Sequence, residues 1–291
     1  MIRESGTGSK TESFAFNPHS FHITPVKLYD AHNHLHDERL ALYLESILSG
    51  LADQGIERMV VNGSCEEDWP AVLALAKRDC RVLPSFGYHP WYVGERTAKW
   101  LETLEIFLDS VPSAVGEIGL DKWITGHDIE DQEIMFTAQL DLAARRNVPV
   151  SIHCLQAWGR LIEILRREPR PARGFVLHSF GGPRELIDAL AELGGYFSLP
   201  GYFAHSRKES QRETFRHVPS DRLLIETDAP DQSLPPERVE YPLPDTREGK
   251  PVNHPANLAA VYRFAAELLG KPLDELAAQV ESNFDRVFGG L

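Results

Sequence analysis

Two histidines separated by one residue are the first feature of this chain that could do chemistry. His32 and His34 follow a short apolar run at 26–29, which is typical of a strand. On an extended segment, residues i and i+2 point to the same side, and imidazole is the commonest side-chain metal ligand. The pair therefore predicts half of a metal site at a strand end. Short motifs of this kind also occur as ordinary polar loop residues, so the pair alone does not establish a metal site.

Ligand-type residues stand at the ends of several other apolar runs. They are Glu117, His153, His178 and Asp228. Each alone has a structural explanation, because a histidine can bond a core carbonyl and a carboxylate can cap a helix. Their coincidence at the ends of different runs favours a functional site. Two other histidines are weaker candidates. His89 could touch substrate or stand in a turn with Pro90, and we expect His36, beside the cap candidate Asp37, on the surface.

The elements that would position these residues alternate along the chain. Apolar, often β-branched runs lie near 26–30, 58–62, 82–86, 113–116, 148–152, 174–178, 195–199 and 222–226. Helical patterns lie at 38–49, 68–77, 97–109, 130–146, 158–167, 184–193, 254–269 and 272–288. This alternation indicates a parallel α/β sheet, and over 291 residues it predicts a closed (β/α)8 TIM barrel. The alternative is a doubly wound open sheet, although no glycine-rich nucleotide fingerprint follows the first run.

The domain organisation expected from composition is simple. Residues 1–25 read as a loose N-terminal arm, and 26–291 read as a single TIM-barrel domain. The proline-rich loop at 229–253 has no periodicity, which in a compact domain usually means function or mobility. The N-terminus has no signal-like or membrane-spanning apolar run. The three cysteines form no Cys-x-x-Cys motif, which fits a reducing cytoplasm. We therefore expect a cytoplasmic protein with no membrane partner.

The ligand-type residues would meet at one rim, because chemistry in a barrel lies at the carboxyl ends of the strands. The set suits two divalent metal ions about 3.5–4 Å apart. His32 and His34 would hold one ion and His153 and His178 the other. Glu117 can bridge, because its carboxylate offers one oxygen to each ion.

Asp228 can bind the first ion and contact a shared water, where it would accept and return a proton. We therefore expect Asp228 and Glu117 to be the catalytic carboxylates. Imidazole-rich ligation suits Zn, Fe or Mn better than Mg, which prefers oxygen. The metal identity stays open among Zn, Mn and Mg. Such ions lower the pKa of a bound water.

The chain resembles the TatD family of metal-dependent hydrolases, within the amidohydrolase superfamily. The matching stretches, in family order, are Asp30–Leu35, Gly87–Pro90, Gly116–Asp121, Ile152–His153, His178–Gly182, Glu226–Pro230, Asn253–Pro255 and Asn283–Gly289. The resemblance implies a (β/α)8 barrel and a TatD-like deoxyribonuclease of the 3′–5′ exonuclease type. It also implies that His32, His34, Glu117, His153, His178 and Asp228 are metal ligands.

Several positions depart from the family pattern where substrate would be read. The family segment His-Ser-Arg-Asp-Ala is here His153–Ala157, with the sequence His-Cys-Leu-Gln-Ala. Ser179 stands where cysteine is common, and His254 replaces a glutamate. Lys122 and Trp123 replace an aromatic-led run. These changes leave the expected ligand set intact.

Cations and aromatics near the same rim are candidates for substrate contact. Lys122, Arg184, Arg207 and Lys208 could meet phosphate, although any one of these four could be a solvated surface charge. His89 could touch substrate or a residue behind the ligands. The aromatic candidates for base stacking are Trp91, Tyr92, Trp123, Trp158 and Tyr202. They could stack bases or simply close the barrel mouth.

The net charge of −13 disfavours a protein that coats nucleic acid. It does not exclude a shallow site that acts on DNA ends. The alternative substrate is a small ester, amide or cyclic amide, and the alternative of another class is a non-catalytic metal-binding protein. The intact ligand set argues against the latter. The sequence does not indicate the oligomeric state.

Overall fold

The computed structural model describes residues 26–126 and 128–291, so the arm expected at 1–25 lies outside the described residues. Parallel strands form one sheet in the order β1 to β8, each paired with the next along the chain. The strands are β1 (Leu28–Asn33), β2 (Ile56–Asn62), β3 (Val82–Phe86), β4 (Ala114–Asp121), β5 (Val150–Leu155), β6 (Phe175–Leu177), β7 (Gly195–Pro200) and β8 (Leu223–Glu226).

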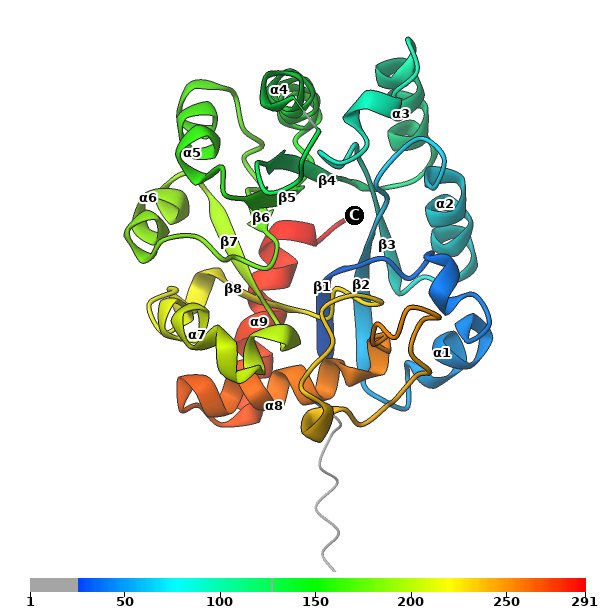
Figure 1. Ribbon diagram of the computed structural model, residues 1–291, viewed down its shortest axis with the longest axis vertical. Coiled ribbons are helices and arrows are strands. Elements are labelled where there is room, and N and C mark those ends of the chain that lie inside the picture. The colour runs from blue at the N-terminus through cyan, green and yellow to red at the C-terminus, as the bar shows by residue number, and fades with distance from the viewer. Residues whose placement is uncertain (1–25, 127) are drawn as a thin grey trace, which may run out of the picture.

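Helices α1 to α8 surround the strands (Figure 1), and α9 packs against β1 and β8. The helices are α1 (Leu44–Gly50), α2 (Trp69–Arg78), α3 (Trp100–Ser110), α4 (Ile129–Arg146), α5 (Trp158–Arg167), α6 (Ile187–Glu192), α7 (Glu209–Phe215), α8 (Leu258–Leu269) and α9 (Leu273–Phe288). The (β/α)8 barrel predicted from the sequence is confirmed.

Several elements differ from the sequence-based expectation, among them β4, which extends to Asp121 beyond the apolar run at 113–116. Asp37 caps only a short 3-10 turn, and the helix expected from residue 38 begins at Leu44. Helix α7 was not predicted, because it buries only Phe215 and therefore shows no apolar periodicity. Strand β1 extends to Asn33, beyond the apolar run. His32 therefore stands on the strand itself.

The seam between β8 and β1 closes the barrel through a few specific bonds. The backbone N–H of Asp228 donates to the His32 carbonyl at 2.9 Å. The buried Asp30 carboxylate accepts from the backbone N–H of Thr227 at 3.0 Å and from its hydroxyl at 2.5 Å. These bonds fix the end of β8 against the end of β1. Asp228, which follows β8, is thereby placed beside His32 and His34.

Glycine is required at one crossing between neighbouring strands. A Cβ at Gly119, whose φ is +150°, would lie 1.9 Å from the His153 carbonyl oxygen. Only glycine lets β4 approach β5 this closely without a clash. The close approach places the end of β4, with its carboxylates, beside the His153 side chain.

The proline-rich segment 229–253 is tethered over the seam. It contains a 3-10 turn at Pro236–Arg238 and an isolated bridge between Pro242 and Asn253. The side-chain amide of Asn253 donates to the Thr227 carbonyl at 2.8 Å. The loop is therefore held at the same end of the barrel as the site.

Candidate metal centre

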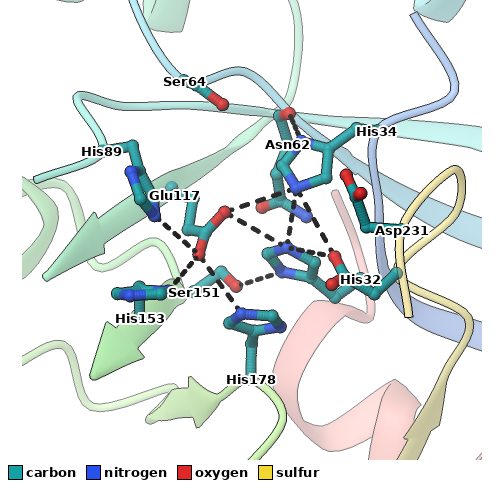
Figure 2. A network of polar contacts seen from close by, with 12 residues as sticks. His32, His34, Asn62, Ser64, His89, Glu117, Ser151, His153, His178 and Asp231 are labelled. Atoms are coloured by element: carbon teal, nitrogen blue, oxygen red, sulfur yellow. Dashed lines mark hydrogen bonds and ion pairs between the residues drawn. The ribbon is translucent and has the colours of Figure 1, made fainter. Parts of the chain in front are cut away.

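The structure brings the six ligand candidates of the sequence into one largely buried cluster. Figure 2 shows Glu117 in the middle of the four histidines His32, His34, His153 and His178. Glu117 Oε1 lies 3.1 Å from His153 Nδ1 and 3.3 Å from His178 Nε2. Glu117 Oε2 lies 3.4 Å from the Nε2 atoms of both His32 and His34. Each oxygen of one carboxylate therefore faces a different pair of histidines.

Asp228 completes the group at the barrel seam. Its Oδ1 lies 3.6 Å from the Nε2 atoms of His32 and His34. Its Oδ2 accepts a hydrogen bond from Gln232 Nε2 at 2.7 Å, and the same amide nitrogen donates to Ser179 Oγ at 2.6 Å. One carboxylate oxygen thus points into the cluster while the other is anchored.

Backbone strain is concentrated at this anchor. Ser179, Asp228 and Gln232 have φ values of 45°, 53° and 49°, in the left-handed region that non-glycine residues rarely adopt. Such conformations persist where the surrounding contacts over-determine them, and they cluster at functional sites. All three residues belong to the single hydrogen-bonded chain that orients Asp228.

The histidines of the β1 pair are backed by uncharged groups. His34 Nδ1 lies 2.8 Å from the Asn62 carbonyl oxygen, which can only accept a hydrogen bond. The Nδ1–H therefore donates, and the lone pair of Nε2 faces the cluster. His32 Nδ1 lies 2.8 Å from the buried hydroxyl of Ser151. A partner behind the ring fixes the orientation of a metal-binding histidine.

The other two histidines are backed by carboxylates. His153 Nε2 lies 3.0 Å from Asp121 Oδ2, so its Nδ1 lone pair faces Glu117. His178 Nδ1 lies 3.3 Å from Glu226 Oε1, so its Nε2 faces the cluster. A carboxylate in this position raises the basicity of the ligand.

His89 also belongs to the cluster, but the ring nitrogen that faces away from the cluster accepts a hydrogen bond instead of donating one. Its Nε2 lies 3.5 Å from Glu117 Oε1, as a ligand's would. Its Nδ1, however, accepts the backbone N–H of Trp91 at 3.2 Å. The neutral ring must then carry its proton on Nε2. In its neutral form His89 therefore presents an N–H to the cluster, whereas His34 and His153 in their neutral forms would present lone pairs.

The charges of the cluster call for a cation. Burial would raise the pKa of Glu117, but the surrounding histidines outweigh it and hold that pKa well below its ordinary value. Burial raises the pKa of Asp228 to about 7. Burial would lower the pKa of His178, but Glu117 and Glu226 outweigh it and raise that pKa to about 10. A divalent cation would supply the same positive charge and displace such protons.

The donor set fits divalent metal ions. Three groups of ligand-type residues have donor atoms within 4.8 Å of one another: His32, His34 and Asp228; His89, Glu117 and His153; and His32, His178 and Glu226. Within the described residues, the buried Glu117 Oε1 has no hydrogen-bond partner despite its histidine neighbours. An unsatisfied buried carboxylate oxygen is costly unless an ion completes it.

Sequence reasoning missed the groups behind the ligands, namely Asp121, Ser151, Glu226 and Gln232. A signal existed for two of them, because residues i and i+2 share one side of a strand. Ser151 is two residues before His153, and Glu226 is two before Asp228. Asp121 is the last residue of β4, beyond the apolar run that the sequence shows, and Gln232 follows the end of β8, where the sequence carries no periodicity.

The remaining predictions have mixed outcomes. His36 was expected on the surface, which is wrong: its side chain is 8% exposed and its Nε2 lies 3.4 Å from Asp68. Lys122 is exposed directly after β4. Arg207 and Lys208 lie 5.0 and 4.8 Å from the centre of the Tyr202 ring, in a turn after β7. Their contact with substrate stays a prediction.

No helix among the described residues has the length and apolarity needed to cross a membrane.

Comparison with known proteins gives a consistent result. The family model "TatD related DNase" matches residues 29–289. A protein named 3′-5′ ssDNA/RNA exonuclease TatD, from Erwinia amylovora, is 34% identical over 90% of this chain and 100% of its own. The crystal structure of YjjV, a TatD homologue from Escherichia coli, has a TM-score of 0.82 at 29% identity and covers 91% of this chain and 99% of its own. A TatD-family hydrolase from Entamoeba histolytica, 18% identical, shares the fold with a TM-score of 0.77 over 90% of this chain and 98% of its own.

Proposed function

The chain belongs to the TatD-related DNase family of metal-dependent hydrolases, and from this premise we propose that it removes nucleotides from the 3′ ends of single-stranded nucleic acid. One observation carries the proposal: the two oxygens of the buried Glu117 carboxylate face separate histidine pairs. That arrangement matches a carboxylate shared by two cations, as in enzymes that displace phosphoryl oxygens in line.

The proposed ligands divide into two sets that share Glu117. His32, His34 and Asp228 would hold one ion, and His153 and His178 the other. The imidazole-rich set favours Zn or Mn over Mg. When bound, such ions lower the pKa of water and stabilise charge on phosphoryl oxygens.

Asp228 is the proposed proton acceptor. Its Oδ1 faces the cluster while Gln232 holds its Oδ2 at 2.7 Å. This geometry lets Oδ1 take a proton from the attacking water and return it to the leaving oxygen. Glu117 keeps both histidine pairs at a fixed separation, which orients the reacting groups.

His89 is proposed to donate a hydrogen bond to a phosphoryl oxygen of the substrate. Its Nε2–H points at the cluster because Trp91 occupies its Nδ1. Lys122, Arg207 and Lys208 would contact phosphates farther along the strand. The net charge of −13 fits an enzyme that grips strand ends through metals and a few contacts rather than through a basic surface.

We also infer a cytoplasmic location. Cys65, Cys80 and Cys154 are free thiols, and free cysteines are typical of proteins in reducing compartments.

A single-stranded oligonucleotide labelled at its 5′ end tests the proposed function. Protein stripped of metal should be inactive, and Zn or Mn should restore shortening from the 3′ end, one nucleotide at a time. The matched control is Glu117→Ala, which should stay inactive with every metal. Turnover of small esters or amides without any cleavage of oligonucleotides would contradict the proposal and favour the alternative substrate class.

A further inference from the structure

We propose that Trp91 is a stacking platform for a nucleobase of the substrate, held beside the metal centre by Asp121 and His89. This inference rests on the proposed function and deepens it. It assigns one side of the site to the bases of the strand, in addition to the groups that act on its phosphates.

Trp91 is connected to the site through both its side chain and its backbone. Its indole Nε1–H donates to Asp121 Oδ2 at 2.7 Å, and the same oxygen lies 3.0 Å from His153 Nε2. Its backbone N–H donates to His89 Nδ1 at 3.2 Å. The ring of Trp91 meets those of His89 and His153 almost edge-on, with centroid separations of 5.1 and 6.5 Å. The indole is therefore fixed next to two members of the cluster.

The indole is nevertheless open to solvent. Trp91 is 37% exposed, whereas Trp69 is 0% exposed and packs in the core. A fixed but exposed aromatic ring adds little to the hydrophobic core. It does offer a preorganised apolar surface, which lowers the entropy cost of binding a flat ligand.

Two more exposed apolar side chains attach to the same part of the rim. Trp123 is 62% exposed, and its backbone N–H donates to Asp121 Oδ1 at 2.7 Å. Leu155 is 38% exposed at the end of β5, and its carbonyl accepts the Lys122 N–H at 2.9 Å. The loops after β3 and β4 and the end of β5 thus present apolar surface beside a cluster that is otherwise polar and charged.

A nucleobase is the occupant that fits this surface. The reacting phosphate must lie at the cluster, so the bases on either side of it lie within reach of the rim. An aromatic ring stacks on any base, because every base has a π face, and such stacking tolerates sequence variation. His89 and His153 lie on the opposite side of Glu117 from His34 (Figure 2). The Trp91 side is therefore distinct from the seam side of the site.

The test combines protein variants with abasic substrates, using the metal-loaded enzyme. Oligonucleotides carry a single abasic residue at the last, second-last or third-last position of the 3′ end. In the wild-type enzyme, one of these positions should raise KM by roughly 5- to 150-fold, the range expected for one lost stack. In Trp91→Leu the KM for the normal strand should already be raised, and the abasic residue should add little.

Two further variants separate stacking from support of the metal centre. Trp91→Phe keeps a ring but loses the bond to Asp121, so it should retain most of the discrimination against the abasic strand. Tyr241→Leu is the matched control, because Tyr241 is 38% exposed. It should behave as the wild type. Metal content should be unchanged in all three variants, and the effect should fall on KM more than on kcat.

The outcomes distinguish the two proposals. If the wild-type enzyme cleaves oligonucleotides but Trp91→Leu discriminates against the abasic strand as well as the wild type does, the subsite is wrong and the exonuclease proposal stands. The subsite is equally wrong if no abasic position affects the wild type. If the metal-loaded enzyme cleaves no oligonucleotide, the proposed function is overturned and the subsite with it.

Discussion

The two halves of the candidate metal centre are built on different principles. In the seam half, the rings of His32 and His34 are backed by a hydroxyl and a main-chain carbonyl, and Asp228 faces them directly. In the other half, the rings of His153 and His178 have a carboxylate behind each, in Asp121 and Glu226. Glu117 faces both halves directly. Apart from Glu117, negative charge faces the histidine pair directly in the seam half, through Asp228, and lies behind the imidazoles in the other half.

This difference predicts which substitutions would weaken metal binding in each half. A charge-assisted hydrogen bond is roughly twice as strong as a neutral one, so the half backed by carboxylates depends strongly on Asp121, which lies behind His153. The seam half depends instead on Asp228 and on the loop that carries it. The two oxygens of the Glu117 carboxylate face one histidine pair each, so Glu117 serves both halves.

Glu117→Ala should have the largest effect, because it removes the group that both halves share. We expect loss of both metal equivalents and a loss of activity larger than the roughly 10–100-fold typical of an outer partner. Elemental analysis of protein purified without chelator, with circular dichroism as the folding control, is the measurement. Full metal content together with full activity would show that the halves do not share this residue.

Asp228→Asn should remove the proposed proton acceptor of the seam half while keeping the shape of the side chain. Asparagine can still ligate through its carbonyl oxygen, but it cannot take a proton. We expect kcat at saturating metal to fall on the order of 10²–10⁴-fold, with unchanged circular dichroism. If saturating metal restored a near wild-type rate, Asp228 would be a ligand only and the proton-transfer role would be refuted.

Asp121→Asn and Ser151→Ala compare the two kinds of backing directly. Asparagine at 121 would place an uncharged amide behind His153 and should weaken one metal equivalent by roughly 10–100-fold. Ser151→Ala removes a neutral partner of His32, worth about 1 kcal/mol, and should weaken the other equivalent about fivefold. Metal titration of the stripped variants measures both. Equal losses would contradict the distinction between the halves.

The sequence predicts the ligands of both halves for one physical reason. In a barrel of parallel strands the carboxyl ends meet, so His32, His153 and Asp228 can be brought together from their positions after apolar runs alone. The β/α alternation sets the order of the strands around the barrel, and this order determines which strand ends are neighbours.

The groups behind the ligands were not predicted, because their roles depend on side-chain direction and on contacts between distant segments. Asp121 reads equally well as a turn residue until β4 and β5 are placed side by side. His36 was misplaced for the same reason: the loop that brings Asp68 over it lies more than thirty positions along the chain. The sequence left His89 undecided, and the N–H of Trp91 that sets its proton is a backbone contact with no residue-type signal.

The smallest expected effect concerns the ion pairs of Arg39 with Asp37 and Asp231, which link the loops after β1 and β8 outside the seam half. Arg39 bonds Asp37 on its own loop and both carboxylate oxygens of Asp231 on the loop after β8. Because these side chains are partly exposed, solvent screening limits their contribution, and Arg39→Ala should cost less than about 1 kcal/mol. For a chain of this size that corresponds to a fall in Tm of at most about 2–4 °C at neutral pH. Thermal unfolding followed by circular dichroism is the measurement.

The pH dependence of that small loss identifies its origin. Burial would raise the pKa of Asp37, but its hydrogen bonds with Arg39 outweigh burial and lower that pKa below the ordinary value of 3.8. A carboxylate whose pKa is depressed by folding contributes stability above its unfolded pKa, and that contribution is lost as the pH falls through the folded pKa. The Tm difference between wild type and Arg39→Ala should therefore be constant from neutral pH down to about 4 and shrink below it. If the difference persisted in acid, the loss would come from packing of the Arg39 stem rather than from its charge. The loops at the seam would then be held together by packing. The electrostatic difference between the two halves would be confined to the residues that surround the ion positions.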